Sequence, residues 1–135
     1  MITRRTQSTR VNSERMRANA IEAAEQCGIL ALPSIAEARP LAAVLDGWDS
    51  ARTLVFCDED AGEADPLAAL AALPRGKALA LLIGPEGGFD PDERAALLAL
   101  PHVARLSLGP RILRADTAAV AALALVQAAL GDWRP

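Results

Sequence analysis

The fold is decided by the stretch from Ala78 to Glu93, which reads ALALLIGPEGGFDPDE. Residues 78–83 are all apolar, which is typical of a strand buried on both faces of a parallel sheet. Residues 84–89 form a glycine-rich loop, and Asp90, Pro91 and Glu93 have the spacing of a helix N-terminus with a capping box. The stretch therefore predicts a strand, a glycine-rich loop and a helix that begins directly after the loop.

The same alternation continues on both sides of this stretch. We expect further strands at 29–32, 53–57 and 103–108, and helices at 13–27, 38–46, 66–73, 91–100 and 116–130. Asn12 or Ser13 is the expected cap of the first helix, and Gly28 is its expected stop. Met16, Ala20, Ile21, Ala24 and Cys27 share one face of it at a spacing of three to four residues, which supports the helix. Apolar strands alternating with helices predict an α/β fold, with a mostly parallel sheet between helices.

The composition limits the class of protein. The 135 residues are enough for one domain, and 52% apolar against 23% charged residues can fill a core. No apolar run reaches the roughly 18 residues of a membrane span, and no secretory signal is visible. Cys27 and Cys57 are expected to be reduced thiols in a cytoplasmic protein. No metal site is expected, because one His and two distant Cys cannot supply a zinc ligand shell.

The charge is distributed unevenly along the chain. The net charge is −3, but residues 1–17 hold five arginines against one glutamate, and residues 58–65 hold five carboxylates and no base. We expect residues 1–12 to form a basic, extended arm in which Arg4 and Arg10, followed by Arg15 in the first helix, contact RNA phosphates. The alternative is a solvated N-terminus without a ligand.

Two loops are expected beyond the carboxyl ends of strands, where open α/β sheets bind ligands. Loop 84–89 matches neither a P-loop nor a dinucleotide fingerprint, and a purely structural turn would also favour its glycines. The second loop carries Arg111 and Arg114 just before a helix, where a cation is unfavourable unless an anion is present. An Arg114–Asp116 surface pair is the alternative there, and His102 is expected in an exposed turn.

Several motifs together resemble the RsmE family, the uridine N3-methyltransferases of small-subunit ribosomal RNA in the SPOUT class. They are IGPEGGF at 83–89, LGPRILR at 108–114 followed by Thr117-Ala118, and EAAEQCG at 22–28. The resemblance spans residues 3–133 and implies a SPOUT-type α/β knot, a deep C-terminal trefoil knot. It also implies that S-adenosylmethionine binds in the knot and that the domain is a homodimer with the site at the interface.

The resemblance implies which residues bind the cofactor, and we hypothesise roles for Arg114, Asp116 and Arg111 from their position next to the cofactor loop. Arg114 would stabilise the charge on the uracil oxygens, and Asp116 would orient the uracil or accept its proton. Arg111 would hold an RNA phosphate or the partner chain. In the family the segment around Asp116 usually reads Arg-Thr-Glu-Thr, and here it reads Arg-Ala-Asp-Thr, with the acid one methylene shorter. The cofactor would be bound by Leu82, Ile83, Gly84, Glu86, Gly88, Leu108, Gly109, Ile112, Leu113 and Thr117.

In this interpretation residues 13–135 are the SPOUT methyltransferase domain, and the family's N-terminal PUA-like RNA-binding barrel is absent. The expected substrate is 16S ribosomal RNA of the small ribosomal subunit, and the expected place of action is the cytoplasm. Three alternatives remain at this point. A SPOUT enzyme of another branch would methylate a ribose 2′-OH, a non-catalytic RNA- or protein-binding module would keep only the fold, and a phosphate-binding regulatory domain would use the glycines alone.

Overall fold

The computed structural model describes residues 1–7, 11–62 and 65–133. Its sheet contains the strands β1 (Thr53–Cys57), β2 (Leu79–Leu82) and β3 (Val103–Leu106), in the order β2-β1-β3. Both pairings are parallel, and Val55 at the centre of β1 lies opposite Leu81 on one side and Ala104 on the other. The expected parallel α/β architecture is confirmed.

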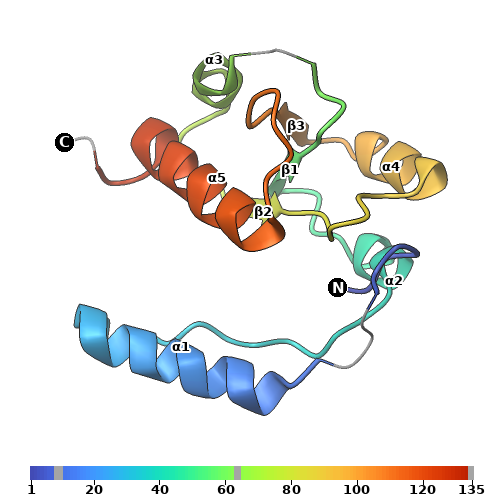
Figure 1. Ribbon diagram of the computed structural model, residues 1–135. Coiled ribbons are helices and arrows are strands. Elements are labelled where there is room, and N and C mark those ends of the chain that lie inside the picture. Colours follow the sequence, from blue (N-terminus) through green and yellow to red (C-terminus); the bar gives the residue numbers. More distant parts are fainter. Residues whose placement is uncertain (8–10, 63–64, 134–135) are drawn as a thin grey trace.

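Helices cover both faces of this sheet (Figure 1). Val55 points to one face, where it packs with Leu70 of α3 (Pro66–Ala71) and Ala122 of α5 (Ala115–Leu130). Its neighbours Leu54 and Phe56 point to the other face and pack against α2 (Leu41–Asp46) and α4 (Pro91–Leu98). The period of two along β1 therefore divides the core into two layers. Across the described residues, every helix is too short or too polar to cross a membrane.

Local sequence signals set the helix ends as expected. The side chain of Asn12 accepts a hydrogen bond from the Arg15 amide at 2.9 Å and begins α1 (Ser13–Cys27), and Gly28 ends it with φ of +66°. At α4, the Asp90 side chain accepts from the Glu93 amide, and the Glu93 side chain accepts from the Asp90 amide at 3.2 Å. This reciprocal pair is the capping box that the sequence predicts.

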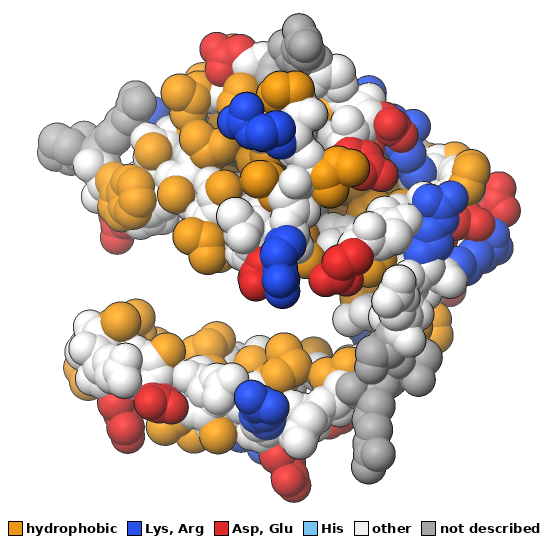
Figure 2. Space-filling view, in the orientation of Figure 1, with side chains coloured by type: hydrophobic (Ala, Val, Ile, Leu, Met, Phe, Trp, Pro, Cys, Tyr) orange, Lys and Arg blue, Asp and Glu red, His pale blue; other side chains and the backbone are white. Residues whose placement is uncertain are grey.

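The expected strand at 29–32 is wrong. Residues 29–32 form no strand: Leu30 is fully exposed, and Ile29 and Leu32 are each 55% exposed. A strand needs a neighbour for its backbone hydrogen bonds, and the described part of the chain places none beside this segment. The apolar face of α1 is also mostly uncovered, since Ala24 is buried but Met16 is 47% exposed. Figure 2 shows an open hollow between α1 and the rest of the molecule.

The core assignment can be tested with Leu106, which is 1% exposed between β1 and α5. Leu106→Ala leaves a cavity and should lower the free energy of unfolding by about 2–5 kcal/mol in a urea titration. Leu30→Ala removes the same atoms from a fully exposed side chain and should change it by less than about 0.5 kcal/mol. Equal effects of the two substitutions would contradict the placement of the core.

Candidate functional site

The carboxyl ends of all the strands meet at one edge of the sheet. β1 ends at Cys57 and Asp58, β2 leads into loop 84–89, and β3 leads into loop 107–114. From this edge the chain enters α3 on one face of the sheet after β1 and α4 on the other face after β2. An edge where consecutive connections leave to opposite faces is where open α/β sheets form a binding crevice.

Loops 84–89 and 107–114 line one crevice of about 340 Å³ together with residues 57–60 after β1. We call it the loop crevice. The structure thus brings together two segments that are separated by residues 90–106 in the sequence. Predicted site residues on its walls are Ile83, Gly84, Glu86, Gly88, Leu108, Gly109, Arg111, Ile112, Leu113 and Arg114.

Some predicted residues lie elsewhere. Leu82 packs beneath loop 84–89 with the core cluster around Phe56. Asp116 and Thr117 lie on the first turn of α5, next to Ala115 and Ala118, which line the crevice. Two arginines expected to contact RNA, Arg4 and Arg15, are exposed outside the crevice, and Arg10 lies outside the described residues.

Arg114 and Asp116 form an exposed ion pair at the start of α5. The Arg114 Nε lies 3.6 Å from the Asp116 Oδ1, and their side chains are 82% and 71% exposed. The same carboxylate accepts a hydrogen bond from the Thr117 amide at 2.7 Å. That bond, together with the charge of Arg114, lowers the pKa of Asp116 below its ordinary value. The Arg114–Asp116 surface pair that the sequence offers as an alternative is therefore observed. Arg114 also lines the loop crevice.

Sequence reasoning missed a charged cluster formed by Asp58, Arg94 and Arg105. Asp58 and Arg94 line the loop crevice. Asp58 is 4% exposed and accepts hydrogen bonds from Arg94 Nε at 3.1 Å, Arg94 Nη2 at 2.9 Å and Arg105 Nε at 2.8 Å. Burial alone would raise the pKa of Asp58, but the bonds from the two arginines outweigh it and lower the pKa. The signal was available, since Asp58 directly follows an apolar strand.

The glycines of loop 84–89 have identifiable neighbours. A Cβ on Gly84 would lie 2.9 Å from the ring of Phe89, which packs edge-on against Phe56 at a centroid distance of 5.2 Å. Gly88 has φ of +66°, and a Cβ there would lie 2.8 Å from the Glu59 carboxylate. The glycines therefore permit both the tight turn and the close approach of Glu59 to the loop.

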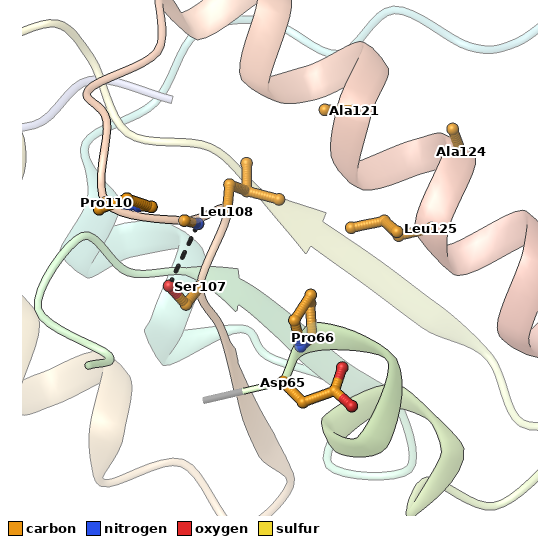
Figure 3. A pocket seen from close by; sticks show the side chains of 9 residues that line it. Asp65, Pro66, Ser107, Leu108, Pro110, Ala121, Ala124 and Leu125 are labelled. Atoms are coloured by element: carbon orange, nitrogen blue, oxygen red, sulfur yellow. Dashed lines mark hydrogen bonds between the residues drawn. The ribbon is translucent and has the colours of Figure 1, made fainter. Parts of the chain in front are cut away.

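A second hollow of about 640 Å³ lies against α5 and also includes loop residues 107–110 (Figure 3). Its lining is mostly apolar, and no residue of loop 84–89 contributes to it. The Gly109 amide donates to Ser107 Oγ at 3.4 Å inside the shared loop. Because only the loop crevice combines both predicted loops with charged side chains, we take it as the candidate site. Figure 3 labels the side chains around the second hollow: Asp65, Pro66, Ser107, Leu108, Pro110, Ala121, Ala124 and Leu125.

The chain belongs to the RNA methyltransferase domain family, whose pattern matches residues 1–127. Among its relatives is the ribosomal RNA small subunit methyltransferase E of Rickettsia conorii, 33% identical over 127 residues. That match covers 94% of this chain and 51% of the relative. The protein of the same name from Bacillus subtilis is 32% identical over 117 residues, which are 84% of this chain and 45% of the relative.

Solved structures of methyltransferases share the fold. A putative methyltransferase from Legionella pneumophila, solved in complex with S-adenosylmethionine, superposes with a TM-score of 0.78 at 32% identity, over 97% of this chain and 54% of that one. Ribosomal RNA small subunit methyltransferase E from Neisseria gonorrhoeae, bound to S-adenosylmethionine, gives 0.73 at 26% identity, over 96% and 54%. The chain therefore spans about half the length of these relatives. All of these relatives are described as methyltransferases, so the comparisons do not favour the alternative of a non-catalytic binding module.

The charged cluster predicts a specific dependence of stability on pH. Asp58→Asn should lower the free energy of unfolding at pH 7 by about 1–3 kcal/mol, because hydrogen bonds to a charged group are lost and two arginines lose their partner. The folded-state pKa of Asp58 is lowered, so its contribution is present above the unfolded pKa of about 3.9 and is lost as the pH falls through the folded value.

Urea titrations from pH 7 down to pH 2 measure this difference between wild type and variant. We expect the difference in the free energy of unfolding between wild type and Asp58→Asn to become smaller below about pH 4. Asp46→Asn, at an exposed position at the end of α2, is the matched control and should show no such gap. A gap that stays constant over the whole range would contradict the assigned ion pairs.

Proposed function

We propose that this chain is the catalytic domain of an S-adenosylmethionine-dependent methyltransferase that methylates N3 of a uridine in 16S ribosomal RNA. The observation that carries the proposal is the loop crevice, in which two loops distant in the sequence line one site at the carboxyl edge of a parallel sheet. Membership of the RNA methyltransferase domain family supports it, as do related structures solved with S-adenosylmethionine.

The chemistry of the crevice walls suits this cofactor. Ile83, Leu108 and Leu113 offer apolar surface for an adenine ring, and Gly84, Gly88 and Gly109 let backbone groups approach it closely. Glu59 and Glu86 bring negative charge to the same crevice, which favours a cationic ligand. When bound, S-adenosylmethionine supplies an electrophilic methyl group on a positively charged sulfur. Three further residues complete the proposed cofactor site. They are the exposed Ile112, Thr117 on α5 and Leu82 at the end of β2.

Arg114 has the clearest catalytic role in this proposal. Uridine N3 carries a proton and becomes a good nucleophile only when that proton leaves, after which negative charge spreads to O2 and O4. A guanidinium directed at one of these oxygens stabilises the anion in a partly water-excluded site. Asp116 is held as a carboxylate by the Thr117 amide and pairs with Arg114, so it can orient Arg114 or the uracil. Its lowered pKa makes it a weaker proton acceptor, which favours this orienting role over proton transfer.

The RNA and the partner subunit belong to the proposal as well. Arg111, which lines the crevice on the same loop as Arg114, would contact a phosphate or a second subunit. The Arg4 guanidinium already bonds Asp90 and Asp92, so a phosphate would have to displace these carboxylates. On α5, Val120 and Leu123 are 71% and 56% exposed and provide an apolar surface for a homodimer. The proposal also includes a trefoil knot in the C-terminal part of the chain and action in the cytoplasm.

The cofactor assignment is tested by calorimetry with S-adenosylmethionine on the purified chain. We expect saturable binding that Arg114→Ala leaves within about twofold, whereas methyl transfer to small ribosomal subunits should fall about 100-fold or more, as expected for removal of a charge-stabilising donor. Absence of binding heat would refute the cofactor site. Unchanged transfer by Arg114→Ala would refute the role of that residue.

The position of the methyl group separates the proposed reaction from ribose methylation. Nuclease digestion and mass spectrometry of the modified RNA should give a methyluridine with its extra mass on the base. Extra mass on the ribose would identify the 2′-OH as the acceptor and contradict the proposal.

The homodimer is tested by sedimentation of the purified chain. We expect a species of twice the 14.1 kDa chain mass. Leu123→Asp should shift it to the monomer, because a charge in an apolar interface is costly to desolvate. Asp46→Asn should leave the dimer intact, and a monomeric wild type would contradict the proposed surface.

A further inference from the structure

Residues 2–6 at the N-terminus are held against the body of the protein. The Ile2 amide donates to the Arg39 carbonyl at 2.8 Å, and the Leu41 amide donates to the Ile2 carbonyl at 2.8 Å. Thr3 is 6% exposed and closes a turn with Thr6, whose hydroxyl accepts from the Thr3 amide at 2.9 Å. We call residues 2–6 the N-terminal strap. Backbone hydrogen bonds therefore hold the start of the strap on the segment 39–41, next to the part of the strap that contacts loop 84–89.

The strap next contacts the helix that follows the glycine-rich loop. The Arg4 amide donates to Glu93 at 2.8 Å, and its guanidinium pairs with Asp90 at 3.0 Å and Asp92 at 2.9 Å. Glu93 and Asp90 are the partners in the capping box of α4. Arg4 thus bonds to the residues that begin α4 and end loop 84–89.

Arg5 contacts the loop itself. Its Nη1 donates to the Gly87 carbonyl at 3.0 Å. A Cβ on Gly87 would lie 3.2 Å from the Arg5 Cβ and 3.3 Å from the Arg5 carbonyl oxygen. Glycine at 87 is therefore explained by the close approach of the strap rather than by a left-handed backbone, since Gly87 is not among the residues with positive φ.

The two neighbours of Gly87, Glu86 and Gly88, both line the loop crevice. Arg5 is not among the residues that line it, so this arginine holds the loop from outside while the loop presents Glu86 and Gly88 to a ligand. Arg5 holds loop 84–89 at Gly87, and Arg4 holds the start of α4 that follows the loop. A loop held in this way loses fewer conformations when a ligand binds.

We propose that Arg5 is a positioning residue that holds loop 84–89 in the shape required for cofactor binding. The proposal rests on the cofactor site proposed above, and it concerns residues outside the crevice. It assigns Arg5 to the loop rather than to RNA, because the guanidinium is bonded to a backbone carbonyl of this chain.

The experiment compares wild type with Arg5→Ala, Arg5→Lys, Gly87→Ala and the Arg5→Ala/Gly87→Ala double variant. Arg75→Ala, an exposed arginine between α3 and β2, is the matched control. Hydrogen exchange of the amides in residues 86–89 is measured without cofactor, and the Kd for S-adenosylmethionine is measured by calorimetry. Thermal unfolding confirms that each variant is folded.

Arg5→Ala should speed amide exchange in residues 86–89 by about fivefold and raise the Kd by about three- to tenfold, as expected for one exposed hydrogen bond. Gly87→Ala should act in the same direction, because its methyl group displaces the strap. The double variant should be no worse than the more severe single variant, since both remove the same contact. Arg5→Lys, which keeps a donor, should lie between wild type and Arg5→Ala.

Each result decides the proposal. Exchange and Kd of Arg5→Ala equal to those of Arg75→Ala would overturn it, as would effects of Arg5→Ala and Gly87→Ala that simply add. A loss of RNA affinity with exchange and Kd unchanged would assign Arg5 to RNA and also overturn it. If the wild type binds no cofactor, the proposed function fails, while exchange in residues 86–89 still decides whether Arg5 holds the loop.

Discussion

The central strand β1 hydrogen-bonds in parallel to β2 on one side and to β3 on the other. In a parallel arrangement all strands end at the same edge, so the residues that follow β1, β2 and β3 must meet there. The chain then leaves β1 and β2 toward opposite faces, which opens the loop crevice between them. The pairing of five residues in β1 thus determines which distant parts of the sequence can form one site.

Asp58 extends this constraint from the backbone to the side chains. A carboxylate that is 4% exposed is costly unless its oxygens are hydrogen-bonded, and here Arg94 of α4 and Arg105 of β3 supply the donors. The same residue donates its amide to the Leu106 carbonyl at 3.2 Å. The cluster therefore links the end of β1 to α4 and β3 beside the crevice. Its loss would loosen the wall of the site as well as the fold.

The features that the sequence predicts best are those that depend on residues close together in the chain. The capping box at Asp90 and Glu93, the stop at Gly28 and the buried strand at 53–57 depend on local hydrogen bonds or on a continuous apolar run, and all are found. The apolar run at 29–32 gives the same signal, but the described residues place no strand beside it. Contacts such as Arg5 to Gly87 and Arg105 to Asp58 join residues 82 and 47 positions apart, so no local pattern indicates them.

Apart from Asp58 and Asp60, which pair with Arg94, the charges around the crevice come from different elements according to sign. Glu59 follows β1 and Glu86 lies on loop 84–89, whereas Arg111 and Arg114 both lie on loop 107–114. Under the proposed function this separation is useful, because a cationic methyl donor and a polyanionic RNA must come together without competing for the same side chains. A uniformly basic crevice would attract RNA but repel the cofactor, and a uniformly acidic one would do the reverse. Under the proposed function the net charge of −3 does not oppose RNA binding, because the arginines of loop 107–114 give one wall of the crevice a local positive charge.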